Sequence, residues 1–190
     1  MKKLICYFGI MLLLSCSNDD TTKENNEFLN QVKGIYTLDK IESDVPLDLN
    51  FDGIAQVNVM GEIDCFSGYQ VIDGNYVIKD EIISRPSFSG GKFNSLDISI
   101  PEHDLINDQP YDQCFNKLWL VYTFEVDENT KQISITGRDS EREAIHGTLT
   151  DIKWENNVIH YWVKRQYLTP DGWKDVVLHI IYNKDLSEKK

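Results

Sequence analysis

The sequence lacks an apolar run long enough to form a transmembrane helix. Its strongly apolar segment follows Met1-Lys2-Lys3 and extends only over the eleven residues from Leu4 to Leu14. At about 1.5 Å per residue, a helix of that length falls well short of a hydrocarbon layer roughly 30 Å thick. A positive start followed by a short apolar run is typical of a secretory signal peptide instead.

Basic side chains are scarce, with 19 Lys and Arg against 31 Asp and Glu. Loss of Lys2 and Lys3 with the signal leaves 17 against 31, a net charge of −14. Phosphate binding needs a basic surface, so nucleic acid is excluded as a partner. The same charge repels anionic headgroups, so attachment to a membrane requires a covalent anchor.

The short segment Leu13-Leu14-Ser15-Cys16 resembles the lipobox of bacterial lipoproteins. The resemblance implies cleavage before Cys16, lipidation of its thiol and acylation of the new amino terminus, which together suffice for stable anchoring. The alternative is an ordinary cleavable signal in which Cys16 is incidental. We expect a signal peptide over 1–15, the lipidated cysteine and a flexible tether over 16–27, and one folded domain over 28–190.

The acidic segment Ser17-Asn18-Asp19-Asp20 is similar to a surface-export signal of some Gram-negative lipoproteins. The expected location is therefore the cell envelope, as an outer-membrane lipoprotein on the periplasmic face or on the cell surface.

Cysteine is rare too, with four residues in the chain. Cys6 would be removed with the signal peptide and Cys16 would carry lipid, so Cys65 and Cys114 remain as free thiols. An even pair in an oxidising compartment predicts a disulfide. Closing a loop of about fifty residues is worth roughly 4 kcal/mol in the chain-entropy description. A metal site is the alternative, but the second Cys or His nearby that zinc sites show is missing.

Helical periodicity is largely absent, and the pattern favours an all-β chain with a short helical segment near the N-terminus. Short turns join neighbouring strands in order, which predicts an antiparallel up-and-down β-barrel. Residues 85–94 and 101–116 are predicted to be loops. The predicted strands are 34–41, 69–72, 76–79, 81–84, 95–100, 117–126, 132–137, 146–154, 158–168 and 174–182.

The last hairpin gives a testable register. A turn through Thr169-Pro170-Asp171-Gly172 that pairs Thr169 with Trp173 sets Val163 opposite His179. In that register His160 and His179 lie on opposite faces, whereas a slip of one residue puts them on the same face near Trp162.

A partial calcium-loop motif begins at Asp48, with Asn50, Asp52 and Gly53 at the third, fifth and sixth positions. The twelfth position is Val59, which offers no oxygen where such a loop needs a bidentate carboxylate. Weak calcium binding through Asp48, Asn50 and Asp52, completed by Glu62 or Asp64, is one interpretation. A turn in which these side chains bond nearby amides is the other.

Signatures of catalysis are missing. The sequence contains no Gly-x-Ser-x-Gly elbow, and Asp139, Glu141 and Glu143 fit a charged, solvated link. The sequence therefore predicts no catalytic residues and favours a non-enzymatic protein.

Aromatic residues gather in the C-terminal half, and Trp119, Trp154, Trp162 and Tyr182 are the candidate ligand-binding side chains. Filling of a β core is the alternative role of such residues.

Together these features resemble the lipocalin-like lipoproteins of certain Gram-negative bacteria. The resemblance is carried by the lipobox, by Gly34-x-Tyr36 in place of the Gly-x-Trp of many lipocalins, by Asp48 to Gly53 followed by Cys65, and by the hairpin Tyr161 to Tyr182. It implies an up-and-down barrel on a lipid anchor that binds a small apolar or amphiphilic ligand. The alternatives are a filled barrel with a protein partner and a cell-envelope hydrolase.

Overall fold

The computed structural model describes residues 26–63, 65–66, 70–72, 75–106 and 109–187, with 65–66, 70–72, 75–76, 103–106 and 109–117 described by their backbone alone. The predicted signal peptide, Cys16 and nearly all of the tether lie outside the described residues, so these assignments stay predictions.

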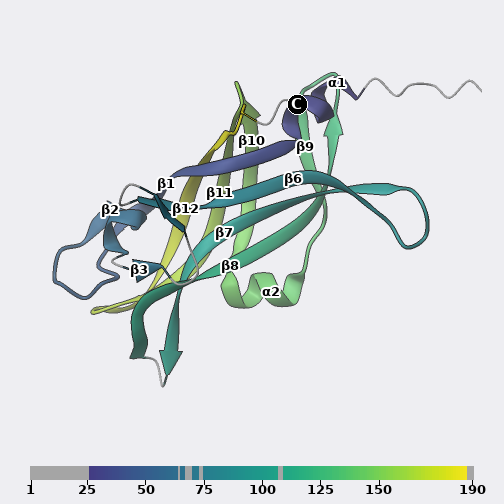
Figure 1. Ribbon diagram of the computed structural model, residues 1–190. Coiled ribbons are helices and arrows are strands. Elements are labelled where there is room, and N and C mark those ends of the chain that lie inside the picture. The colour runs from purple at the N-terminus through teal and green to yellow at the C-terminus, as the bar shows by residue number, and fades with distance from the viewer. Residues whose placement is uncertain (1–25, 64, 67–69, 73–74, 107–108, 188–190) are drawn as a thin grey trace, which may run out of the picture.

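Most of the chain forms one antiparallel sheet that curls round on itself, with few helices (Figure 1). This confirms the all-β barrel prediction. The elements, in chain order, are α1 (Glu27–Val32), β1 (Gly34–Leu47), β2 (Gln56–Asn58), the 3₁₀ helix η1 (Val59–Glu62), β3 (Cys65–Phe66), β4 (Gln70–Ile72), β5 (Asn75–Val77), β6 (Lys79–Pro86), β7 (Lys92–Ile106), β8 (Gln109–Asp127), β9 (Gln132–Gly137), α2 (Ser140–His146), β10 (Thr148–Glu155), β11 (Val158–Thr169) and β12 (Gly172–Lys184).

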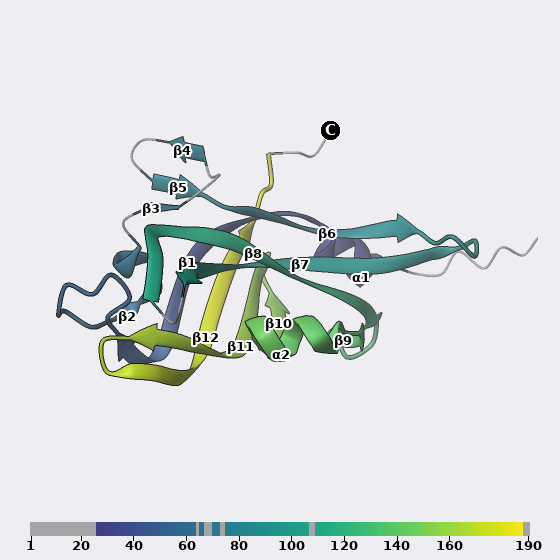
Figure 2. The same ribbon diagram turned by 90° about the horizontal axis from the view of Figure 1, so that it is seen from below.

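The barrel wall has an up-and-down order. Neighbouring strands follow one another as β9, β8, β7, β6, β1, β12, β11 and β10, so that β12 pairs back onto β1. The sheet is nearly closed, and α2 connects β9 to β10 across the remaining seam (Figure 2). This arrangement is compatible with a lipocalin-like fold. The short strands β2 and β3 join the wall at β1 and β8, and β4 and β5 form a separate hairpin.

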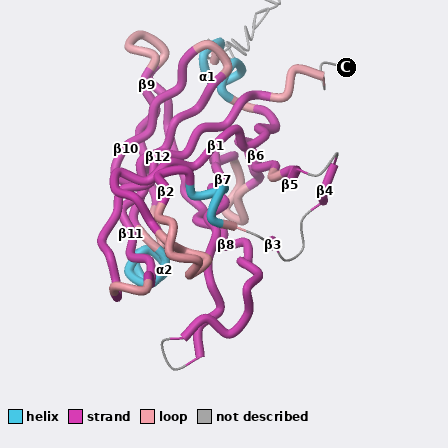
Figure 3. Tube along the Cα trace, turned by 90° about the vertical axis from the view of Figure 1, so that its left-hand side faces the viewer, coloured by secondary structure: helices cyan, strands magenta, loops and turns pink. Residues whose placement is uncertain are grey.

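The two helices lie toward opposite ends of the barrel (Figures 1 and 3). Helix α1 covers one end, where Phe28 and Val32 are buried and Glu128 accepts hydrogen bonds from the backbone N–H groups of Phe28 (2.7 Å) and Leu29 (3.1 Å). Tyr36 of the Gly34-x-Tyr36 motif lies beneath it, and the Trp154 indole donates to the Tyr36 hydroxyl at 2.9 Å. We call the other end, where β1 and β11 end and β12 begins, the distal end.

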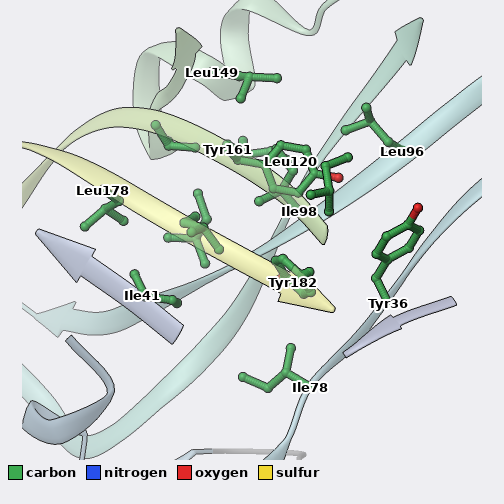
Figure 4. Packing of buried hydrophobic residues seen from close by; sticks show 14 of the residues in the cluster. Tyr36, Ile41, Ile78, Leu96, Ile98, Leu120, Leu149, Tyr161, Leu178 and Tyr182 are labelled. Atoms are coloured by element: carbon green, nitrogen blue, oxygen red, sulfur yellow. The ribbon is translucent and has the colours of Figure 1, made fainter. Parts of the chain in front are cut away.

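The interior is filled by alternate side chains of the strands, because successive residues of a strand point to opposite faces. On β11 the inward positions are 159, 161, 163, 165 and 167, all buried. Figure 4 shows how inward residues of different strands meet in one cluster. Its largest fully buried side chains are those of Tyr36, Tyr122, Tyr161, Tyr182, Phe28 and Phe124.

Two predicted loops are wrong. Residues 101–106 continue β7 and residues 109–116 begin β8, and the two strands pair to extend the wall. Residues 140–146, predicted to be a charged link, form α2, because the Asp139 side chain caps the first turn by accepting from the Arg142 backbone N–H at 3.0 Å. Polar composition predicted exposure at both places but could not distinguish loop from regular structure.

The predicted register of the last hairpin is wrong by one residue. Thr169 pairs with Gly172, so Trp162 stands opposite His179 and Tyr161 opposite Ile180. Only Pro170 and Asp171 remain in the turn, and Gly172 has a positive φ of 101°, a backbone conformation that glycine adopts without steric cost. The glycine thus serves as the first residue of β12.

Candidate functional site

The four candidate ligand-binding aromatics do not share a site. Tyr182 is fully buried in the core, and Trp154 packs edge-on against Phe28 under α1, with ring centroids 5.5 Å apart. Trp119 is 49% exposed on β8, next to the inward Leu120, and Trp162 lies on the outer face of β11. Four separate environments therefore hold these four residues, and they share no pocket.

The one-residue change of register places His160 and His179 on the same outer face. The Trp162 ring stacks on His179 with centroids 4.6 Å apart, and Nδ1 of His160 lies 3.0 Å from Nε2 of His179. Burial lowers the pKa of His179, and the nearby His160 lowers it further. A neutral His179 suits this stack, because among the described residues no carboxylate lies at hydrogen-bond distance from its ring to stabilise a positive charge.

Tyr182 belongs to a buried polar network. Its hydroxyl donates to the Asp80 carboxylate at 2.5 Å, and the same carboxylate accepts from the Ser99 backbone N–H at 2.7 Å and the Ser99 hydroxyl at 2.6 Å. Burial raises the pKa of Tyr182 well above its ordinary value, with the Asp80 charge adding to the effect. The network stabilises the packing of β12 against β6 and β7, so the role of Tyr182 is structural.

Two clefts on the surface of the barrel are candidate binding sites. The larger one, about 670 Å³, lies beside α1 and the β6–β7 hairpin, and polar side chains such as Lys33, Lys92 and Glu125 dominate its lining. The smaller one, about 160 Å³, lies at the distal end between α2 and the β11–β12 hairpin. The smaller cleft combines apolar walls with the buried charged side chain of Arg165.

The apolar walls of this distal cleft come from Ile145 of α2, Leu168 of β11 and Trp173 of β12. Ile145 is 73% exposed and Trp173 is 51% exposed. Exposed apolar side chains thus lie on both sides of the cleft, and an exposed apolar patch with a polar rim is a feature of many binding sites.

The floor of the distal cleft is polar and fixed. The Arg165 guanidinium lies over the Tyr167 ring, 4.1 Å from its centroid, and Nη1 of Arg165 and the Tyr167 hydroxyl donate to the Pro101 carbonyl at 3.2 and 2.8 Å. Glu102 lies between Arg165 and His146, with Oε1 3.7 Å from Arg165 Nη2 and Oε2 3.0 Å from His146 Nδ1. Burial raises the pKa of Tyr167 to about 12, so its hydroxyl remains a donor.

The Asp48 loop adopts the turn that the sequence indicates. Asp48 is buried and accepts from the backbone N–H groups of Asp52 (3.1 Å) and Gly53 (3.0 Å), and Asn50 accepts from Asp52 N–H at 3.1 Å. Phe51 and Gly53 have positive φ values of 61° and 86°, which bend the chain around the Asp48 carboxylate. The loop lies at the distal end, on the same side of the molecule as the β11–β12 turn (Figures 1 and 2).

Glu62 of η1 reaches back to this loop. Its side chain is fully buried, and Oε2 accepts from the Leu49 backbone N–H at 3.0 Å. The other oxygen, Oε1, is buried without a hydrogen-bond partner. Burial raises the pKa of Glu62, the Leu49 N–H and the nearby Gln56 side chain offset part of this increase, and the charges of Asp52 and Asp48 add to it.

The predicted disulfide partners lie opposite each other along the backbone. Strand β3 pairs in parallel with β8, with Cys65 opposite Cys114 and Phe66 opposite Phe115. Residues paired across neighbouring strands have Cα atoms about 5 Å apart, within the range that disulfides span. The side chains of both cysteines lie outside the described part, so the bond itself stays a prediction.

Sequence reasoning missed Arg165, Glu102 and the position of Glu62. A signal for Arg165 was available, because the alternation of Tyr161, Val163, Arg165 and Tyr167 puts the arginine on the inward face of β11. Glu102 gave no such signal, because its segment was predicted to be a loop.

Among the described residues, no group of three or more His, Cys, Asp or Glu side chains is already placed to hold a metal ion. No helix within the described ranges is long and apolar enough to cross a membrane. No protein-family model, curated protein or solved structure matches the chain.

Proposed function

We propose that this chain is a lipid-anchored, non-catalytic binding protein of the bacterial cell envelope, and that its distal cleft binds the polar head of a small amphiphile. The observation that carries the proposal is the pairing, in one cleft, of exposed apolar walls with the buried Arg165 and the half-buried Glu102. The barrel acts as a rigid scaffold for this cleft, since its interior is packed with side chains.

The size and polarity of the cleft restrict the ligand. A volume of about 160 Å³ is smaller than the several hundred Å³ that enclose a whole drug-sized ligand, so only one end of the ligand enters. Arg165 supplies a donor and Glu102 an acceptor, a combination that suits an uncharged head with hydroxyl or amide groups. The apolar tail would then lie against Ile145 and Trp173.

The location rests on the N-terminal sequence and on the cysteine pair. The lipobox ending at Cys16 supports lipid attachment, and the backbone pairing of Cys65 with Cys114 supports a disulfide formed in an oxidising compartment. Both features are expected of an envelope protein.

Mass spectrometry of the full-length protein, extracted from envelopes in mild detergent, tests the lipid anchor, the disulfide and the bound ligand separately. Intact mass should show a chain that begins at acylated Cys16 and is two hydrogens lighter than the fully reduced chain. Native mass spectrometry should show a further retained mass. A chain that begins elsewhere overturns the anchor, and a reduced pair of cysteines overturns the disulfide.

Matched variants locate the ligand. Trp173→Ala should lose the retained mass, whereas Trp119→Ala, which removes an equally exposed tryptophan from a different part of the wall, should keep it. Equal retention by both variants, or no retained mass in the unsubstituted protein, contradicts ligand binding in the distal cleft.

A filled barrel with a protein partner is the second candidate function, and the solid interior is the observation that favours it. It predicts no retained small molecule but a specific cross-link from a photoreactive residue at position 173 that is not seen from position 119.

A further inference from the structure

We propose that the Asp48 loop and Glu62 together form a calcium site at the distal end of the barrel. This site is separate from the distal cleft and does not depend on what the cleft binds. Glu62 reaches the loop through η1 and has one buried oxygen without a hydrogen-bond partner.

The sequence places oxygen donors at the positions that a calcium loop uses. Asp48, Asn50 and Asp52 occupy the first, third and fifth positions, and Gly53 the sixth. The seventh position, Ile54, contributes a backbone carbonyl in such loops, and the ninth is Gln56, whose amide oxygen can ligate directly or through water. All these donors are oxygens, which suits a hard divalent cation and not zinc.

The missing carboxylate at the twelfth position has a structural explanation. Val59 occupies that position, and its side chain is fully buried in the core. The chain then forms the 3₁₀ helix η1, in which residues three apart lie on the same side, so Glu62 lies next to Val59 along one face. Glu62 thus supplies, three residues late, the carboxylate that the usual spacing would require of Val59.

Glu62 carries the observation that points to a ligand. Its side chain is fully buried and is held against the loop by the Leu49 N–H bond at 3.0 Å, yet Oε1 has no partner. A buried carboxylate oxygen left unpaired is costly, and native structures rarely keep one without a role. Neither Asp48, Asp52 nor Glu62 takes part in an ion pair in the described part of the chain.

Bound calcium would coordinate the carboxylates of Asp48, Asp52 and Glu62 and compensate their negative charge. One oxygen each from Asp48, Asn50 and Asp52, the Ile54 carbonyl and both oxygens of Glu62 make six ligands, and water or Gln56 completes a seventh. This lies within the six to eight oxygen ligands that calcium takes. The oxygens of Asp48 that accept backbone N–H bonds keep a second lone pair for the ion.

The arrangement of the loop also determines the affinity that we expect for calcium. Because the carboxylates are not yet gathered around one point, the exposed part of the loop must move toward Glu62 as the ion binds. That movement costs free energy, so we expect a dissociation constant of about 10⁻⁴ to 10⁻³ M, as in extracellular calcium modules. Bound calcium would fix the loop next to its exposed residues Phe51 and Ile54.

The test is thermal unfolding of the full-length protein in detergent, after chelation, with added CaCl₂ or MgCl₂. Calcium at ten times its dissociation constant should raise the folding equilibrium constant about 11-fold, and magnesium should have little effect. Asp52→Asn and Glu62→Gln should abolish the calcium response. Asp151→Asn, which removes an exposed carboxylate from β10, should retain it.

Glu62→Gln also separates a calcium ligand from a purely structural residue. Its amide oxygen can still accept from Leu49 N–H, so without calcium the variant should be at least as stable as the unsubstituted protein. No calcium response up to about 10 mM, an equal response to magnesium, or an undiminished response in Glu62→Gln would overturn the site.

Discussion

Removal of the Tyr182 hydroxyl is the sharpest test of how the barrel core is held together. In Tyr182→Phe the ring stays in a fully buried site, but the Asp80 carboxylate loses the donor that lies 2.5 Å away. A hydrogen bond to a charged group contributes about 1.5–3 kcal/mol, so we expect the free energy of unfolding to fall by about 2 kcal/mol. For a domain of this size, that corresponds to a melting temperature lower by about 4–8 °C.

The control is Tyr161→Phe, which removes the same atom from a ring that is also buried in the core. Within the described residues the Tyr161 hydroxyl makes no hydrogen bond, and its ring packs edge-on against Tyr182 with centroids 6.0 Å apart. We expect a loss within about 0.5 kcal/mol in urea unfolding followed by tryptophan fluorescence. Equal losses in the two variants would refute the argument that the Asp80 hydrogen bond, and not the ring alone, stabilises this region.

Two further predictions concern pH and the closed end of the barrel. Because burial and His160 depress the pKa of His179 below its ordinary 6.5, the unfolded chain binds more protons near that pH, so stability should rise as pH increases toward 6.5 and level off above it. NMR titration should place the His179 pKa below 6.5 and show it rising in His160→Gln; an unshifted pKa contradicts the stack. Glu128→Gln keeps its size but weakens the charged cap on the first turn of α1, so the urea midpoint of unfolding should fall. Glu125→Gln, on the neighbouring strand β8, serves as its control, and equal losses would contradict the cap.

The sequence alone determined the fold class, because alternation of apolar and polar residues with short turns between segments favours an antiparallel meander over any helical arrangement. The spacing of three residues between the apolar Leu38 and Ile41, which breaks the alternation of a strand, coincides with a register shift of β1 between Leu38 and Lys40 against β12. Residues 101–116 could not be assigned in this way, because a strand rich in Pro, Asp and Asn is stabilised by pairing with its neighbour and not by its own composition.

Tertiary structure decided which polar residues meet. A single residue in the β11–β12 turn determines whether His160 and His179 share a face, and that choice depends on the conformation of Gly172 and on packing of the whole hairpin. Likewise, the sequence pattern marked Asp48, Asn50 and Asp52, but only the packing of Val59 into the core explains why Glu62 faces their loop. The sequence therefore shows which polar residues one segment contains, whereas the contacts between distant segments depend on how the barrel closes.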